Sequence, residues 1–278
     1  RLIVNSIESA LEDKNILVTG GCGFIGSEVT KQLSEQGANI TVIDNLSSGK
    51  EEYIQKIPRV ELIKSDLSQI SSFKSILEGM DYVINLAALP FIPDSYYMPM
   101  KFFEFNVNST IALALEVVKQ KNIKKFIHIS SSEIYGSAKY IPMDENHPTL
   151  PQSTYAVSKL AADRVVFTMY KEHGLPAVII RPFNSFGPNI TQPYIIPEII
   201  SQMLKNNNKI SLGNVNTKRD LTYVSDTAKG IISSLTAEGV VGETINVGSQ
   251  RSVSIKELVN MISEILEKDV EIEIDVSR

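Results

Sequence analysis

Tyr155 and Lys159 are the two side chains of this 278-residue chain whose types and spacing most directly predict catalytic chemistry. They stand four residues apart in a segment with helical character, so both should lie on one helix face, one turn apart. A phenol has a pKa near 10 and is a poor base at neutral pH unless its phenolate is stabilised. Lowering that pKa to about 7 takes roughly 4 kcal/mol, which a close ammonium and a second positive charge together can supply. We therefore expect Tyr155 to act as a base that Lys159 activates.

A serine run at residues 130–132 ends an apolar, strand-like segment and adds a second set of candidates. If the backbone stays extended there, alternate side chains point the same way. This alternation predicts one shared pocket for Ser131, Glu133 and Tyr135, and directs residues 130, 132 and 134 elsewhere. The sequence thus predicts a hydroxyl and a carboxylate in the pocket that the phenol serves.

A glycine-rich turn joins a buried strand at residues 16–19 to a helical segment that runs to Gln36. Its three glycines are spaced as GxxGxxG, which suits a tight turn, close approach of the backbone to a pyrophosphate, and close packing of helix on strand. The helix N-terminus then offers free N–H groups to the phosphates. We expect a dinucleotide site here, formed by Gly20, Gly23, Phe24, Ile25 and Gly26.

Asp44 follows a second strand at residues 39–43 and lies 18 residues beyond Gly26, close to the separation at which dinucleotide folds carry a ribose-binding carboxylate. A carboxylate there binds the adenosine ribose hydroxyls and repels a 2′-phosphate, which favours NAD over NADP. The alternative is that Asp44 simply begins the turn that follows.

Strands and helices alternate along the first two thirds of the chain, with further strands at 60–64, 82–85, 124–130 and 176–181. This pattern predicts an α/β fold with a doubly wound parallel sheet, whose ligands lie at the carboxyl ends of the strands. We expect a Rossmann domain from residues 12–182 and 220–248, and a smaller substrate-binding lobe from residues 183–219 and 249–278. A short amphipathic helix is compatible with residues 1–15.

The composition excludes several other classes of protein. A net charge of −5 and a pI near 5.4 argue against nucleic acid or an anionic membrane as a partner. A single cysteine, Cys22, rules out an intrachain disulfide framework and fits a cytoplasmic protein. No apolar run is long enough to span a membrane, and the three histidines lack the spacing of metal ligands, so we expect no metal.

Several motifs together resemble the extended short-chain dehydrogenase/reductase family, in its branch of NAD-dependent nucleotide-sugar epimerases, dehydratases and decarboxylases. The resemblance runs from residue 15 to residue 247. The motifs are Gly20-x-x-Gly23-x-x-Gly26, Asp44, Asp66-Leu67, Ser131, Tyr155-x-x-x-Lys159, Arg181-Pro-Phe-Asn184 and Arg219-Asp220.

The resemblance implies roles for these residues. Tyr155 would take a proton from a sugar hydroxyl that Ser131 also binds, and Lys159 would hold the nicotinamide ribose. Asn184 and Arg219 would bind the nucleotide diphosphate. The remaining residues expected to contact NAD are Asn45, Asp66, Leu67, Leu86, Ala87, Ala88 and Pro182.

Within this branch, Glu133 resembles the glutamate of 4,6-dehydratases and of some decarboxylases. Residues 195–197 and 218–224 resemble dehydratases that act on UDP-N-acetylglucosamine-type sugars, which favours a 4,6-dehydratase. Oxidation at carbon 4 acidifies the carbon 5 hydrogen, which a carboxylate can remove, whereas a simple 4-epimerase needs no carboxylate. Ser132 occupies the position at which dTDP-glucose dehydratases carry an aspartate as general acid, so we count it among the catalytic and substrate-binding candidates. Asn189 stands where relatives often carry arginine.

Three alternatives remain open: a UDP-sugar 4-epimerase, then a UDP-glucuronate decarboxylase, and, outside enzymes, an NAD-binding interaction module. The expected substrate is a UDP-hexose or UDP-N-acetylhexosamine. The resemblance also implies a homodimer formed through helices near 100–121 and 151–173, and a small lobe cut short at Arg278.

Overall fold

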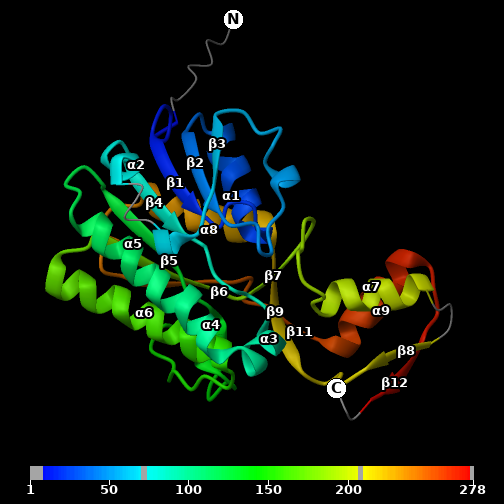
Figure 1. The fold of residues 1–278 in the computed structure, drawn as a ribbon. Coiled ribbons are helices and arrows are strands. Elements are labelled where there is room, and N and C mark those ends of the chain that lie inside the picture. Colours follow the sequence, from blue (N-terminus) through cyan, green and yellow to red (C-terminus); the bar gives the residue numbers. More distant parts are fainter. Residues whose placement is uncertain (1–8, 70–73, 206–208, 276–278) are drawn as a thin grey trace, which may run out of the picture.

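The computed structural model describes residues 9–69, 74–205 and 209–275. Most of the short helix expected within residues 1–15 therefore lies outside the described residues. The fold has two parts, a large layered body and a smaller lobe that projects from it (Figure 1).

Seven strands of the described chain form one parallel sheet in the order β10-β6-β5-β4-β1-β2-β3. The strand order reverses between β1 and β4, which is the topological switch point where doubly wound sheets bind ligands. The fold class predicted from the sequence is confirmed. The strands are β1 Asn15–Thr19, β2 Asn39–Asp44, β3 Val60–Lys64, β4 Tyr82–Asn85, β5 Lys125–Ile129, β6 Ala177–Pro182 and β10 Thr244–Val247.

Helices cover both faces of this sheet (Figure 1), and the alternation of side chains along β1 shows how each face builds its own core. Ile16 and Val18 pack on the side of α1 and α8, whereas Leu17 packs on the side of α2, α5 and α6. The helices are α1 Phe24–Glu35, α2 Lys74–Glu78, α5 Ser109–Val118, α6 Thr154–His173 and α8 Val224–Thr236, with a short 3₁₀ turn η1 Glu51–Tyr53.

The helical segment after β4 is less regular than the sequence predicted. A short helix, α3 Ile92–Tyr97, forms in the segment between β4 and residue 100, which contains three prolines. The single helix expected from about 100 to 121 consists instead of α4 Pro99–Phe103, a π-helical turn η3 Glu104–Asn108, and α5. Asn106 lies in that π turn, where it accepts a hydrogen bond from Leu89 N (2.8 Å) and donates to Ser158 Oγ (3.0 Å). It thereby ties the loop after β4 to helix α6.

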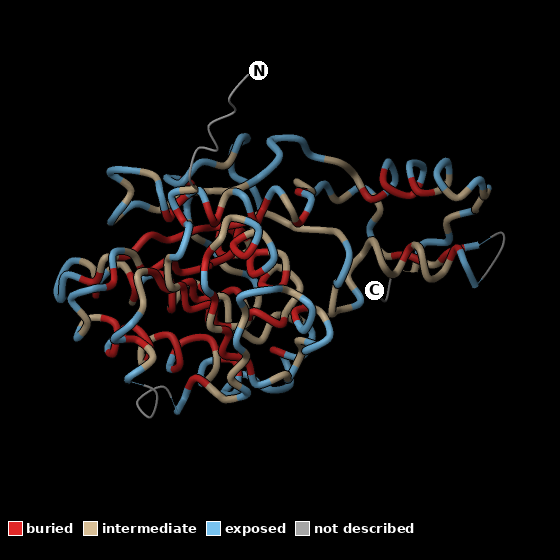
Figure 2. Tube along the Cα trace, turned by 90° about the horizontal axis from the view of Figure 1, so that it is seen from above, coloured by how far each residue is buried: buried red, intermediate tan, exposed pale blue. Residues whose placement is uncertain are grey.

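The smaller lobe has a core of its own. Figure 2 shows the lobe to the side of the main body, with a separate group of buried residues. Helices α7 Ile195–Lys205 and α9 Ile255–Leu266 pack on strands β8 Lys209–Leu212 and β12 Glu271–Ile274. Helix α9 begins with a capping box of Ser254 and Glu257.

A second, three-stranded sheet within the described residues joins the two parts. Its order is β11-β9-β7, with β7 Asn184–Phe186, β9 Lys218–Tyr223 and β11 Ser252–Ser254. Because β7 directly follows β6 of the large sheet and β9 leads into α8, the chain crosses between body and lobe several times. The cleft between them is therefore walled by segments far apart in the sequence.

Candidate active site

A cavity of about 670 Å³ lies at the carboxyl ends of the large sheet and extends toward the smaller lobe. It brings together all but one of the residues expected to react or to bind NAD or substrate, although their individual roles stay predictions. Those that line it are Gly20, Gly23, Phe24, Ile25, Gly26, Asp44, Asn45, Asp66, Leu67, Leu86, Ala87, Ala88, Ser131, Glu133, Tyr155, Lys159, Pro182, Asn184 and Arg219.

The glycine turn has the shape that a pyrophosphate needs. Gly20 has φ of +71°, and a Cβ on it would lie 2.8 Å from Ala87 N, so only glycine fits. A Cβ on Gly26 would collide with the carbonyl of Gly20. Gly23 is the N-cap of α1 and has no side chain to cap the helix, which leaves the first N–H groups available to an anion. These residues fit a bound dinucleotide.

Asp44 begins the turn that follows β2, which is one of the two alternatives that the sequence left open, and it also lines the cavity. It is buried at the end of β2, where its carboxylate accepts hydrogen bonds from Cys22 N (3.0 Å) and Leu46 N (2.8 Å). Burial raises the pKa of Asp44, and these two hydrogen bonds oppose that change. The carboxylate thus holds both neighbouring loops in place while it lines the cavity on the side where the resemblance places the adenosine ribose.

Replacing Asp44 with asparagine should weaken NAD binding by about tenfold, the effect of losing roughly 1.4 kcal/mol from a charge-assisted hydrogen bond. The loss should be smaller for NADP, because the repulsion of a 2′-phosphate disappears as well. Calorimetric titration with both cofactors measures the two affinities. Glu35→Gln, at the exposed end of α1, is the matched control. An unchanged ratio of NAD to NADP affinity would contradict the role of Asp44.

The serine run does not continue as an extended strand, so that prediction is wrong. Strand β5 ends at Ile129, and Ser131 is the N-cap of a 3₁₀ turn, η4 Ser132–Tyr135, with its Oγ accepting from Glu133 N (3.1 Å). Because the chain turns here, Tyr135 leaves the cavity and lies fully buried behind it, while Ser130 joins the lining. Ser131 and Glu133 do line the cavity together, as expected.

Ser132 is the expected site residue that the structure does not bring to the cavity. It is buried within η4 and is absent from the residues that line the cavity. Strand alternation from Ser131 already directed residue 132 away from the pocket, and only the resemblance placed a catalytic residue there. The geometry therefore gives no support to Ser132 as an acid or a substrate ligand.

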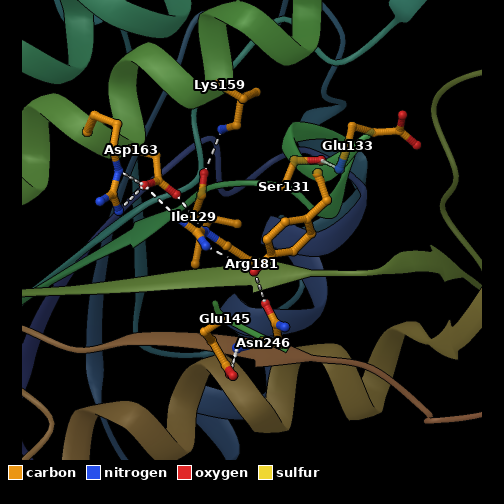
Figure 3. A network of polar contacts seen from close by, with 10 residues as sticks. Ile129, Ser131, Glu133, Glu145, Lys159, Asp163, Arg181 and Asn246 are labelled. Carbon is orange, nitrogen blue, oxygen red and sulfur yellow. Dashed lines mark hydrogen bonds and ion pairs between the residues drawn. The ribbon is translucent and has the colours of Figure 1, made fainter. Parts of the chain in front are cut away.

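Tyr155 and Lys159 lie one turn apart on α6, as predicted, and the helix begins where Ser153 Oγ accepts from Ala156 N (3.0 Å). The Lys159 ammonium is buried and donates to Ile129 O at 2.6 Å (Figure 3). Burial lowers the pKa of Lys159 to about 8, and the charge of Asp163 opposes this.

The phenol of Tyr155 is not a ready base in the protein alone. Burial raises its pKa to about 12, a hydrogen bond with Ser131 opposes the rise, and the negative charge of Glu133 adds to it. The sequence predicted that the ammonium of Lys159 acts together with a second positive charge to lower this pKa. An oxidised nicotinamide would supply the second positive charge that stabilises the phenolate. The site is therefore chemically suited to NAD.

Asp163 is a residue of this region that sequence reasoning missed. It is fully buried one turn beyond Lys159 and forms an ion pair with Arg181, whose Nε donates to Oδ2 at 2.9 Å. Arg181 also donates to the Tyr135 hydroxyl at 2.9 Å, which continues the network to Asn246 (Figure 3). The signal was present in the i, i+4, i+8 spacing of residues 155, 159 and 163 along one helix face.

Other reactive side chains in the described residues have structural roles. Burial raises the pKa of Cys22 to about 12 and lowers that of His128 to about 3, so both stay neutral. No group of histidines, cysteines and carboxylates within residues 9–69, 74–205 and 209–275 could hold a metal ion. In the same part of the chain, every helix is too short or too polar to cross a membrane.

The sequence model of the GDP-mannose 4,6 dehydratase family matches residues 17–277 of this chain. The chain belongs to this family. Its members are extended short-chain dehydrogenases/reductases of the NAD-dependent epimerase/dehydratase type, so the resemblance inferred from the motifs is confirmed, as is NAD as the cofactor.

Similar proteins include both epimerases and dehydratases. A putative UDP-glucose 4-epimerase of Methanocaldococcus jannaschii is 32% identical, with 89% of this chain and 81% of the relative covered. A solved UDP-N-acetylglucosamine 4-epimerase of Methanobrevibacter ruminantium is 36% identical with a TM-score of 0.87, covering 95% of this chain and 86% of that one. The dTDP-glucose 4,6-dehydratase DesIV of Streptomyces venezuelae, solved with NAD, is 28% identical with a TM-score of 0.85, covering 94% and 85%.

This epimerase/dehydratase family member is therefore an NAD-dependent enzyme, and the alternative of a non-catalytic NAD-binding module falls away. Relatives are nucleotide-sugar 4,6-dehydratases, 4-epimerases and a uronate decarboxylase. Which of these reactions the chain performs depends on the side chains of the cavity.

Proposed function

We propose that the enzyme is a nucleotide-sugar 4,6-dehydratase that acts on a UDP-hexose or UDP-N-acetylhexosamine. One observation carries the proposal: the Glu133 side chain lines the same cavity as Tyr155 and is close enough for its charge to raise the pKa of the phenol. In Figure 3 the carboxylate points away from the buried Asp163–Arg181 network. A carboxylate base thus stands beside the expected proton acceptor of the 4-hydroxyl.

The chain's own groups then account for the proton transfers. Tyr155 accepts the proton of the 4-hydroxyl, which Ser131 also binds. NAD, held by the glycine turn, Asp44 and Lys159, would supply the reversible hydride transfer between carbon 4 and carbon 6 of the sugar. The carbon 4 ketone acidifies the hydrogen on carbon 5, and Glu133 removes that hydrogen as a proton while the 6-hydroxyl departs. Glu133 afterwards returns a proton to carbon 5.

The side chains that line this cavity are less suited to 4-epimerisation or decarboxylation. A 4-epimerase, the activity named for two of the similar proteins, needs no carboxylate facing carbon 5. A decarboxylase must hold the 6-carboxylate of its substrate, yet Lys159 and Arg219 are the cations among the described lining residues. In the proposed arrangement Lys159 binds the nicotinamide ribose and Arg219 binds the diphosphate, so neither is free for a 6-carboxylate. Glu133 would also repel that carboxylate.

Incubation of the protein with UDP-N-acetylglucosamine and NAD in heavy water tests the proposal. A dehydratase forms a 4-keto-6-deoxy product that carries solvent deuterium at carbon 5, which NMR detects. An unlabelled galacto-configured product would instead establish a 4-epimerase. UDP-glucuronate, tested in parallel, would reveal a decarboxylase by release of carbon dioxide.

The remaining parts of the proposal concern binding and assembly. Asn184 on β7 and Arg219 on β9 belong to adjacent strands of the three-stranded sheet, line the cavity, and are proposed to bind the diphosphate. Residues 12–182 and 220–248 are proposed to form the NAD-binding domain, and 183–219 and 249–278 the substrate-binding lobe. We place the enzyme in the cytoplasm.

A homodimer is proposed through helices α4, α5 and α6, which lie together on one side of the body (Figure 1). Large apolar side chains there are exposed to solvent, among them Met100 (83%), Leu115 (45%) and Val157 (41%). Burying such side chains favours association.

A further inference from the structure

The phenol of Tyr194 enters the cavity from the small lobe, opposite the Rossmann side. Tyr194 immediately precedes α7, and its half-buried ring packs edge-on against Phe91 at 6.4 Å between centroids. Its hydroxyl lies 3.5 Å from Pro90 O, in the loop that follows β4. Both Tyr194 and Tyr155 line the cavity, so two phenols from distant parts of the chain share one site.

The hydroxyl of Tyr194 is placed to donate a proton. At 3.5 Å, its hydrogen bond to Pro90 O is at the outer limit of such contacts, so the O–H can turn to a better acceptor. Burial raises the pKa of Tyr194, and the nearby charge of Tyr155 raises it further. Tyr194 therefore remains a neutral phenol in the presence of a Tyr155 phenolate.

Elimination of water across carbons 5 and 6 requires such a donor, because hydroxide is a poor leaving group. Glu133 is used as the base for carbon 5, and Ser132, the expected donor position, lies outside the cavity lining. Tyr194 supplies an O–H in the same cavity, from the side of the substrate lobe.

We propose that Tyr194 is the general acid that protonates the departing 6-hydroxyl, an inference that rests on the proposed dehydratase function. As Glu133 takes the carbon 5 proton, the C5–H electron pair forms the C5=C6 double bond and the C6–O bond breaks. The departing oxygen takes the O–H proton of Tyr194 and leaves as water. Tyr194 becomes a phenolate.

Because both phenols line one cavity and interact electrostatically, a proton passing between them would close the proton cycle. Tyr155 holds the proton that it took from the 4-hydroxyl, and Tyr194 has lost one to water. Transfer of a proton from Tyr155 to Tyr194 restores the phenolate of the first and the phenol of the second. The net change is loss of one water from the sugar, and no external acid or base is consumed.

Tyr194→Phe tests this assignment, since it removes the hydroxyl and keeps the ring against Phe91. With UDP-N-acetylglucosamine, formation of the 6-deoxy product should fall by about 10²- to 10³-fold, while reduction of NAD by the substrate stays near the wild-type extent. A 6-deoxy-6-fluoro analogue of the same substrate loses fluoride, which needs no proton. Its elimination by the variant should be within about threefold of wild type, far less affected than the loss of water.

Tyr223→Phe is the matched control, because Tyr223 packs on Phe186 and is absent from the residues that line the cavity. This variant should turn over both substrates at the wild-type rate. If the wild type forms no 6-deoxy product, the dehydratase function and this inference fall together. If the wild type dehydrates and Tyr194→Phe does so equally well, the inference alone falls. Equal slowing of both substrates by Tyr194→Phe would also overturn it, since that result indicates a packing role.

Discussion

Replacing Tyr155 with phenylalanine is expected to lower turnover of the nucleotide sugar by about 10³-fold or more, toward the upper range for loss of a general base. The variant keeps the ring and its edge-on contact with Phe102 at 6.4 Å, so the fold of α6 should be preserved. It loses the oxygen that receives the 4-hydroxyl proton, so every later step is blocked. Product formation from UDP-N-acetylglucosamine, followed by NMR, measures the effect.

Two further measurements separate chemistry from folding in this variant. The thermal unfolding midpoint and the NAD affinity of Tyr155→Phe should stay close to the wild-type values, because the ring remains in place. Tyr140→Phe, at an exposed tyrosine on the surface, is a control of the same chemical type. Turnover within tenfold of wild type would show that another group accepts the proton.

Replacing Glu133 with glutamine should lower water loss by about 10²- to 10⁴-fold while leaving oxidation at carbon 4 intact. Glutamine has nearly the same shape but cannot accept the carbon 5 proton. Removal of the negative charge also takes away one of the causes that raise the Tyr155 pKa, so the first proton transfer should not become slower. Deuterium incorporation at carbon 5 in heavy water, measured beside the reduction of NAD, separates the two steps.

Glu172→Gln, at the exposed end of α6, is the matched control for loss of a carboxylate and should have no effect on either step. Retention of water loss by Glu133→Gln would remove Glu133 as the base. If wild type and variant both gave the galacto-configured sugar, the enzyme would be a 4-epimerase and the carboxylate would be dispensable.

Much of the framework was predictable because it depends on local sequence patterns. The apolar runs that form β1 to β6 are short and bounded by turns, a sequence pattern typical of buried parallel strands. The capping box of α9 needs only Ser254 and Glu257, three residues apart. The irregular helix after β4 was not predictable in the same way, since the π turn at 104–108 accompanies the contacts of Asn106 with the loop after β4 and with α6.

The errors around the serine run have a physical cause. Strand alternation holds only while the backbone is extended, and the chain leaves that conformation one residue after Ser131. Tyr135 consequently turns into the interior, where its hydroxyl contacts Arg181 and Asn246, residues more than forty positions away. A local pattern contains no information about such partners.

The sequence by itself determined the glycine turn, the place of Asp44 at the end of a strand and the one-turn spacing of Tyr155 and Lys159, because each depends on a few neighbouring residues and on the period of one strand or helix. Only the tertiary structure decided that Ser130 joins the cavity lining while Tyr135 leaves it, that Asp163 pairs with Arg181, and that Tyr194 and Tyr155 line the same cavity. The physical reason is that these relations join residues from different elements. Their distances are set by the packing of the whole sheet, its helices and the smaller lobe.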